Sequence, residues 1–212
     1  MDRAQENFLK KLLLLFALIS ITSFASLDWN IERLQSHLGY GEYSEVKELN
    51  SDEAWAILAY GFTDETDYQD MNGYLRHGSD YKLYNQTEKS VKKLIDDIIS
   101  AAEKLPRMPV GLIAYRGFKL KWRNDKCFST GEVISDKAFN SMTLNKKIAN
   151  HFAFKKETGK GAFLTLELGS SKKGIMIIEN DEDEVLLMPG LNIKITKSFE
   201  EEGKCFAEGL VE

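Results

Sequence analysis

The chain has 212 residues, of which 43% are hydrophobic and only three are proline. This length and composition suit one ordinary globular domain and exclude an intrinsically disordered chain. The formal net charge of −5 argues against a nucleic-acid partner, because holding a phosphate backbone requires clustered Lys and Arg.

The first 25 residues are predicted to be a secretory signal peptide. Lys10 and Lys11 precede an apolar run over residues 12–22, and residues 23–25 (Ser-Phe-Ala) place small side chains where a signal peptidase inspects the chain. The run is shorter than the roughly 20 residues of a bilayer-spanning helix. An uncleaved membrane anchor and a buried helix are the alternatives.

Residues 26–212 are expected to form a single acidic domain, since no repeat, low-complexity tract or Gly/Ser/Pro linker divides them. Export would place this domain in an oxidising environment, where Cys127 and Cys205 could form a disulfide. Two buried free thiols are equally compatible with the sequence, because it gives no distance between them.

The first half of this domain, from about residue 30 to residue 105, has a helical pattern. Helices are expected over residues 51–60, 68–76 and 87–105. The last of these carries apolar residues at three- and four-residue steps, with Thr87 as its cap and Pro106 as its stop. Ser51 is expected to cap the first.

The second half has the texture of short strands separated by Gly, Asn and Lys turns. Strands are expected over residues 110–118, 161–170, 172–180, 184–190 and 191–199. One helix interrupts them at residues 144–154, with Leu144, Ile148 and Phe152 on one apolar face. Helices followed by strands indicate an α+β domain. No glycine-rich fingerprint of a dinucleotide-binding Rossmann domain follows any strand.

Arg116 stands inside an otherwise apolar strand segment. A buried guanidinium must meet a carboxylate, a phosphate or water, because burying it without a partner costs several kcal/mol. A structural salt bridge is the ordinary interpretation of such an arginine. Gly117, directly after it, favours a ligand site instead, because glycine lets a ligand approach the backbone closely.

Ser141 lies between the apolar pair at 138–139 and the helix expected at 144–154, where a turn or cap hydroxyl is the ordinary interpretation. No Gly-x-Ser-x-Gly motif surrounds it. Three scattered histidines give little support to a Ser-His hydrolase.

The acidic stretch 179–184 runs directly into the apolar segment 185–188. In an extended chain alternate side chains share a face, so Glu182 and Glu184 would form a pair. A solvated turn is the ordinary interpretation of such a charge run. Glu184, however, is joined directly to apolar residues, which places one carboxylate at the edge of the core.

Taken in order, these segments resemble the Arg-Ser-Glu class of mono-ADP-ribosyltransferases, which includes clostridial binary toxins, bacterial effectors and vertebrate ecto-enzymes. The residues at 115–117 (Tyr-Arg-Gly), 139–143 (Phe-Asn-Ser-Met-Thr) and 182–189 (Glu-Asp-Glu, an apolar run and Pro) match its three motifs. The helix at 68–76 resembles a further family segment. The resemblance covers roughly residues 51–195.

This resemblance implies an N-terminal helical half followed by a mixed, mainly antiparallel β-sandwich core that uses NAD as co-substrate and no metal. Glu184, oriented by Ser141, would stabilise the cation formed when nicotinamide leaves the ribose. Asn72, Arg76 and Arg116 would bind NAD.

The resemblance assigns three further roles. Arg116 and Arg76 would take the pyrophosphate of NAD, and the backbone at Gly117 would receive the nicotinamide amide. Glu182 would orient an acceptor guanidinium and take up its proton, because in the family Glu at this position accompanies arginine modification.

The chain departs from the family pattern at Met142 and Thr143, which replace the Thr and the final Ser of the second motif. Altered tuning of the site is expected, without loss of activity. An NAD glycohydrolase and a catalytically inactive secreted binding module are the alternative functions.

The expected partner is a target protein bearing a reactive arginine, reached after secretion with the help of a separate delivery partner. A periplasmic protein and one tethered to the membrane by an uncleaved N-terminal segment are the alternatives. No stable membrane span is expected once the signal peptide is cleaved.

Overall fold

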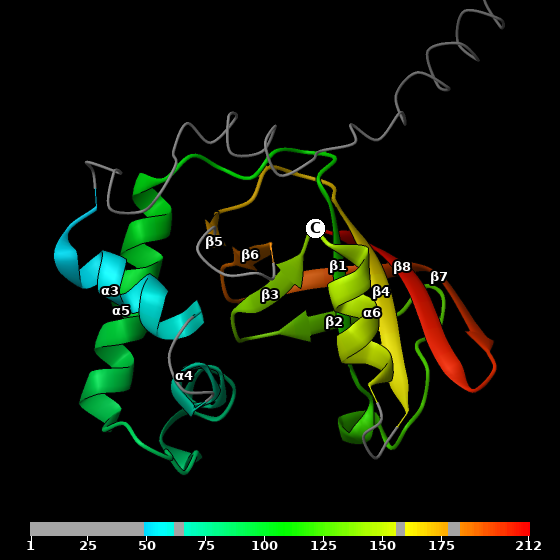
Figure 1. Ribbon diagram of the computed structural model, residues 1–212, viewed down its shortest axis with the longest axis horizontal. Helices are drawn as coiled ribbons and strands as arrows, with labels where there is room; N and C mark the ends of the chain where they lie inside the picture. The colour runs from blue at the N-terminus through cyan, green and yellow to red at the C-terminus, as the bar shows by residue number, and fades with distance from the viewer. Residues whose placement is uncertain (1–48, 62–65, 156–159, 178–182) are drawn as a thin grey trace, which may run out of the picture.

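The computed structural model describes residues 49–61, 66–155, 160–177 and 183–212 (Figure 1). The predicted signal peptide lies outside these ranges. Within them, no helix is both long and apolar enough to cross a membrane. The helices are α3 (Ser51–Gly61), α4 (Thr66–His77), α5 (Glu88–Lys104) and α6 (Lys146–Phe154), with 3-10 turns η2 (Gly78–Asp80) and η3 (Lys121–Arg123).

Helices α3, α4 and α5 gather on one side of the molecule, on the left in Figure 1. Helix α5 begins as expected, because the hydroxyl of Thr87 accepts a hydrogen bond of 3.2 Å from the backbone N–H of Ser90. It ends with Leu105 as its C-cap, directly before Pro106. Its apolar face is buried, so packing stabilises the helix in addition to its own hydrogen bonds.

The cap of α3 is Asn50, so the expectation that Ser51 caps this helix is wrong. Asn50 Oδ1 accepts from the N–H of Asp52 and Glu53, and Glu53 Oε2 accepts in return from Asn50 N–H at 2.9 Å. This reciprocal capping box satisfies donors that the first helical turn leaves unpaired. Glu53 is 2% exposed and also accepts from Ser100 and Lys104 of α5, which joins the two helices.

The strands form a single eight-stranded sheet in the order β2-β7-β8-β4-β1-β3-β6-β5. They are β1 (Ile113–Lys119), β2 (Val133–Asp136), β3 (Asn140–Thr143), β4 (Gly161–Leu168), β5 (Gly174–Ile177), β6 (Glu184–Leu187), β7 (Leu191–Glu201) and β8 (Lys204–Val211). Every neighbouring pair is antiparallel except β4 and β8, which confirms the predicted α+β class with a mainly antiparallel core. Strands β2, β3 and β8 were not predicted from the sequence.

A narrow joint connects the two parts of this sheet. Strands β1 and β3 pair at a single position, Tyr115 opposite Thr143. By contrast, β1 pairs with β4 along its whole length, and β3 pairs with β6 at every residue. The five strands from β2 to β1 and the three strands β3, β6 and β5 therefore form two ladders that meet at one residue pair.

Helix α6 lies directly on strands β1 and β4, in front of them in Figure 1. Two glycines permit this close approach: a Cβ atom at Gly117 would collide with the carbonyl of Ala149, and one at Gly161 with the carbonyl of Ala153. The side chains of Ala149 and Ala153 are fully buried in this contact. Gly117 is therefore required by helix packing, a reason that its position beside Arg116 did not indicate.

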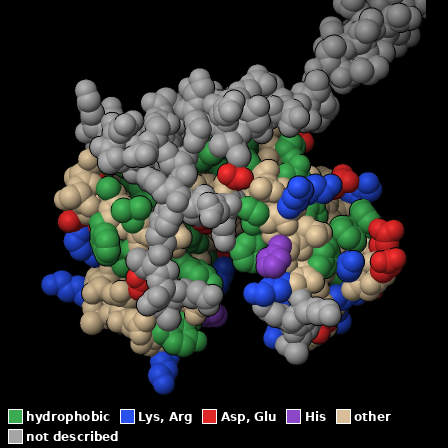
Figure 2. All heavy atoms as spheres, in the orientation of Figure 1, with side chains coloured by type: hydrophobic (Ala, Val, Ile, Leu, Met, Phe, Trp, Pro, Cys, Tyr) green, Lys and Arg blue, Asp and Glu red, His purple; other side chains and the backbone are tan. Residues whose placement is uncertain are grey.

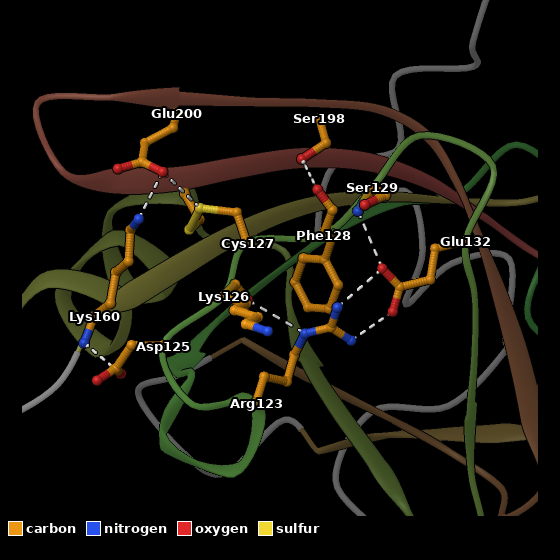
Figure 3. Close-up of a disulfide and its surroundings, with 11 residues drawn as sticks. Arg123, Asp125, Lys126, Cys127, Phe128, Ser129, Glu132, Lys160, Ser198 and Glu200 are labelled. Carbon is orange, nitrogen blue, oxygen red and sulfur yellow. Dashed lines mark hydrogen bonds and ion pairs between the residues drawn. A yellow bond between two sulfur atoms is a disulfide. The ribbon is translucent and has the colours of Figure 1, made fainter.

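The structure joins Cys127 and Cys205 in a disulfide, which decides the question that the sequence left open (Figure 3). The bond fixes the segment after η3 to the start of β8, with a Cα–Cα distance of 5.5 Å. Beside it, Lys160 forms an ion pair with Glu200, and Ser198 donates a hydrogen bond to the carbonyl of Phe128. The segment is thus held covalently and by polar contacts.

Candidate active site

A cavity of about 500 Å³ lies between the helical part and the strands. Figure 2 shows the surface hollowed between these two parts. Six of the seven site residues predicted from the sequence line this cavity: Asn72, Arg76, Arg116, Gly117, Ser141 and Glu184. The seventh, Glu182, lies outside the described residues. Segments more than 100 residues apart in the chain therefore meet at one place.

Helix α4 presents Asn72 and Arg76 to the cavity from one face, because they are four residues apart. Both ends of the Asn72 amide are used: its Oδ1 accepts from the N–H of Phe139 at 3.1 Å, and its Nδ2 donates to the Tyr60 hydroxyl at 3.0 Å. Asn72 therefore ties α4 to the segment that enters β3. Burial raises the pKa of the Tyr60 hydroxyl, and the negative charge of Glu184 raises it further.

Arg76 is held by the carboxylate of Asp136, at the end of β2. Its Nε and Nη2 donate to the two carboxylate oxygens at 3.0 and 2.8 Å, a bidentate pair. This hydrogen bonding raises the pKa of Arg76. Burial opposes ionisation of Asp136, but the hydrogen bonds from Arg76 and from the backbone N–H of Ala138 outweigh it and lower the pKa of Asp136.

Arg116 is held by a neutral group. Its Nη1 donates to Oδ1 of Asn140 at 2.5 Å, and no ion pair joins it to a carboxylate in the described part of the chain. Burial lowers the pKa of Arg116, although a guanidinium remains protonated in proteins. Among the described residues, Arg116 thus does not form the structural salt bridge that is the ordinary interpretation of such an arginine.

Ser141 and Glu184 lie on neighbouring antiparallel strands, β3 and β6. Glu184 is directly opposite Thr143, whereas Ser141 is opposite Leu186. Ser141 and Thr143 are two residues apart in the strand and share a face, so Glu184 is the direct neighbour of Thr143 and the diagonal neighbour of Ser141. Glu184 is only 5% exposed, and it opens onto the cavity at the edge of the core as expected.

The pleat that was expected to align Glu182 with Glu184 is interrupted at Asp183. Its φ of 50° lies in the left-handed region, so the chain is not extended there, and alternation of side chains cannot be carried across it. The Asp183 carbonyl accepts a hydrogen bond of 3.0 Å from the Leu144 N–H, which fixes the approach to β6 beside the approach to α6.

Helix α6 contributes to the cavity two of the apolar residues that were expected to share one face of the helix. Ile148 and Phe152 line the cavity wall, and Phe152 is 45% exposed. The buried face of α6 is formed by Ala149 and Ala153. The reason is the close contact of α6 with β1 and β4, which admits only small side chains and turns the larger ones toward the cavity.

The cavity thus combines two guanidiniums, a nearly buried carboxylate and an apolar wall. The guanidiniums suit an anionic group such as a pyrophosphate. The carboxylate suits a centre that gains positive charge during a reaction, because its effect is larger in a poorly solvated site.

A family model described as ADP-ribosyltransferase exoenzyme matches residues 35–205 of the chain. No curated protein matches the chain by sequence. Among solved structures, the Vis toxin, an ADP-ribosyltransferase from Vibrio splendidus, shares 22% identity over 88% of this chain and 83% of that chain, with a TM-score of 0.65. A Vis complex with agmatine shares 21% identity over 86% and 84%, with a TM-score of 0.65.

Two clostridial structures are also similar. The ADP-ribosylating toxin BECa of C. perfringens, solved with NADH, shares 24% identity over 84% of this chain and 47% of that chain, with a TM-score of 0.63. The Clostridium limosum C3 exoenzyme shares 16% identity over 86% and 95%, with a TM-score of 0.62.

At these identities the solved structures establish a shared fold, that of the ADP-ribosyltransferase toxins. The family model spans most of the sequence, including every predicted site residue. The chain therefore belongs to the ADP-ribosyltransferase exoenzyme family.

Proposed function

We propose that the protein is an exported mono-ADP-ribosyltransferase of the Arg-Ser-Glu class that transfers ADP-ribose from NAD to an arginine of a target protein. One observation carries the proposal: Arg116, Ser141 and Glu184, which stand on three different strands, all line one cavity. A set of side chains that only stabilised the fold would have no reason to converge on a cavity with this chemistry.

The reaction breaks the bond between nicotinamide and ribose, and the bonding electrons leave with nicotinamide. The ribose then carries positive charge in an oxocarbenium-like transition state. In this proposal the Glu184 carboxylate stabilises that charge and accepts a hydrogen bond from the ribose 2′-hydroxyl, while Ser141 orients the carboxylate. Because Glu184 is nearly buried, its charge acts in a poorly solvated site.

The rest of the cavity would hold NAD in place. Arg76 and Arg116 bind the pyrophosphate, Asn72 supports that region of α4, and the backbone of Gly117 receives the nicotinamide amide. Gly117 lines the cavity, which agrees with this role, although the absence of its side chain is already required by the contact with α6.

The acceptor is an arginine side chain, which replaces nicotinamide on the ribose. A protonated guanidinium is a poor nucleophile, so a carboxylate must orient it and take its proton; Glu182 has this role in the proposal. The Vis complex with agmatine supports an acceptor of this type, because agmatine carries a guanidinium group.

Three glutamine variants test the proposal with NAD and agmatine as substrates. Glu184→Gln should lose both nicotinamide release and transfer to agmatine. Glu182→Gln should retain nicotinamide release with water as acceptor and lose the transfer. The matched control, Glu201→Gln at an exposed position of β7, should resemble the unaltered protein.

The outcomes separate the competing functions. Nicotinamide release without transfer by the unaltered protein would identify an NAD glycohydrolase. Failure of the unaltered protein to bind NAD in calorimetry would identify a binding module of the same fold. Full activity of Glu184→Gln would refute the assignment of the catalytic carboxylate.

We also propose that the protein is secreted, with cleavage after Ala25, and acts on a protein of another cell. N-terminal sequencing of the mature protein tests the cleavage. Mass spectrometry of cell lysates treated with labelled NAD would identify the modified protein and show whether the modified residue is an arginine. Modification of another residue type would refute the assigned acceptor.

A further inference from the structure

The two guanidiniums of the cavity are anchored by different chemistry. Arg76 is bound through two hydrogen bonds by the carboxylate of Asp136, so an opposite charge already balances it. Arg116 donates to the amide oxygen of Asn140, which has no net charge. In the described part of the chain, Arg76 is therefore paired directly with a carboxylate, whereas Arg116 is hydrogen-bonded to a neutral amide and feels the charge of Asp136 only at longer range.

Asn140 is built to hold Arg116 in one orientation. It is fully buried, and its Nδ2 donates to the carbonyl of Ala138 at 3.0 Å while its Oδ1 accepts from Arg116. Because each end of the amide has its own partner of opposite polarity, a rotation that exchanges the two ends would lose both bonds. The backbone N–H of Ala138 donates in turn to Asp136, so both anchors belong to one hydrogen-bonded segment.

We propose that Asn140 is a positioning residue that presents Arg116 to the pyrophosphate of NAD as a cation with no directly paired carboxylate among the described residues, whereas Asp136 keeps Arg76 as a neutralised pair that supplies geometry. This inference rests on the proposed function. It explains why an amide stands at the fully buried position beside Arg116 where a carboxylate would make a stronger bond to the guanidinium.

Substitution by aspartate places a negative charge beside Arg116. It also removes the bond to the Ala138 carbonyl, because a carboxylate has no N–H to donate, and comparison with Asn140→Ser isolates the effect of the charge. In Asn140→Asp a carboxylate of nearly the same shape would neutralise Arg116, and it would compete with the pyrophosphate for the guanidinium. The Kd and the KM for NAD should rise by about 10-fold or more, with a small effect on kcat. Salt should then weaken NAD binding less than it does in the unaltered protein, because one attraction between opposite charges has been removed.

Two further variants complete the design. Asn140→Ser removes the anchor and adds no charge, so it should weaken binding and leave the salt dependence unchanged. Asn150→Asp adds the same charge at an exposed position of α6 and should behave as the unaltered protein. Calorimetry with NAD at about 50 and 300 mM salt, a range over which screening changes strongly, measures these affinities.

A fourth variant tests the contrast from the other side and is the deciding one if Asn140→Asp does not fold. Asp136→Asn removes the charge that pairs with Arg76 and that also acts on Arg116 at longer range, so the salt dependence of NAD binding should become steeper. If the salt dependence of NAD affinity is unchanged or weaker in Asp136→Asn, the inference is overturned. It is also overturned if a folded Asn140→Asp variant has the NAD affinity and the salt dependence of the unaltered protein.

Failure of the proposed function looks different from failure of this inference. If the unaltered protein does not bind NAD, the proposed function is refuted, and the inference about Asn140 falls with it. If the unaltered protein binds NAD and the folded Asn140→Asp variant binds equally well, only the inference is refuted. If Asn140 had only a structural role, Asn140→Asp and Asn140→Ser would both lower the melting temperature and leave the salt dependence of NAD binding unchanged.

Discussion

Removal of the disulfide should lower stability strongly and leave the catalytic chemistry intact. The cysteines are 78 residues apart, so the bond closes a long loop in the unfolded chain. In the chain-entropy model a loop of this length corresponds to about 4.5 kcal/mol of stability. For a domain of this size each kcal/mol shifts the melting temperature by about 2–4 °C, so the double variant Cys127→Ser with Cys205→Ser should melt roughly 10–15 °C lower.

Urea unfolding followed by tryptophan fluorescence measures this loss, with the unaltered protein under reducing and non-reducing conditions as the comparison. The reduced protein should unfold at the same urea concentration as the double variant. Neither sulfur lies on the described wall of the cavity, so transfer to agmatine should persist at 25 °C in the folded variant. A double variant within about 1 kcal/mol of the oxidised protein would refute the loop-closure reasoning.

Three other changes have directions that follow from the structure. Burial opposes ionisation of Glu53. Hydrogen bonds outweigh this effect, the one from Lys104 most of all, and lower the pKa of Glu53 from 4.5 to about 2. Its ionised form thus stabilises the fold above pH 4.5, and this stability is lost as the pH falls toward 2; Glu53→Gln should flatten that dependence in acid unfolding. Gly117→Ala should destabilise by about 1–3 kcal/mol in thermal melting, because the added methyl group meets the Ala149 carbonyl. Phe152→Ala should raise the KM for NAD about fivefold with little change in melting temperature, because this exposed ring lines the cavity.

The sequence predicted the helices and most of the strands, because their apolar residues are large and regularly spaced. Helix α5 and strand β4 are examples. Strand β8 was missed because three of its four inward positions are small, namely Cys205, Ala207 and Gly209. The packing at Gly209 is tight, since a Cβ atom there would lie 3.0 Å from the side chains of Ile193 and Leu166. Close packing of this kind removes the alternation that indicates a strand.

The site residues were predicted through the order of their motifs, and their partners were not. Asp136 and Asn140 hold the two arginines across separations of 60 and 24 residues, and no short sequence motif contains such a pair. Asp136 lies on β2 and Asn140 lies on β3, two short strands that were also not predicted from the sequence. The left-handed turn at Asp183 was equally hidden, because an aspartate can adopt either conformation and the fold selects one.

The single pairing of Tyr115 with Thr143 has a consequence for how the enzyme can vary. Arg116 lies on one side of this joint, and Glu184 lies on the other. Besides that pairing, the hydrogen bond from Arg116 to Asn140 and the contacts of α6 with β1, β4 and β3 connect the two sides. Substitutions in α6 should therefore change the alignment of the two groups proposed to bind one substrate, while the pairing within each ladder stays intact.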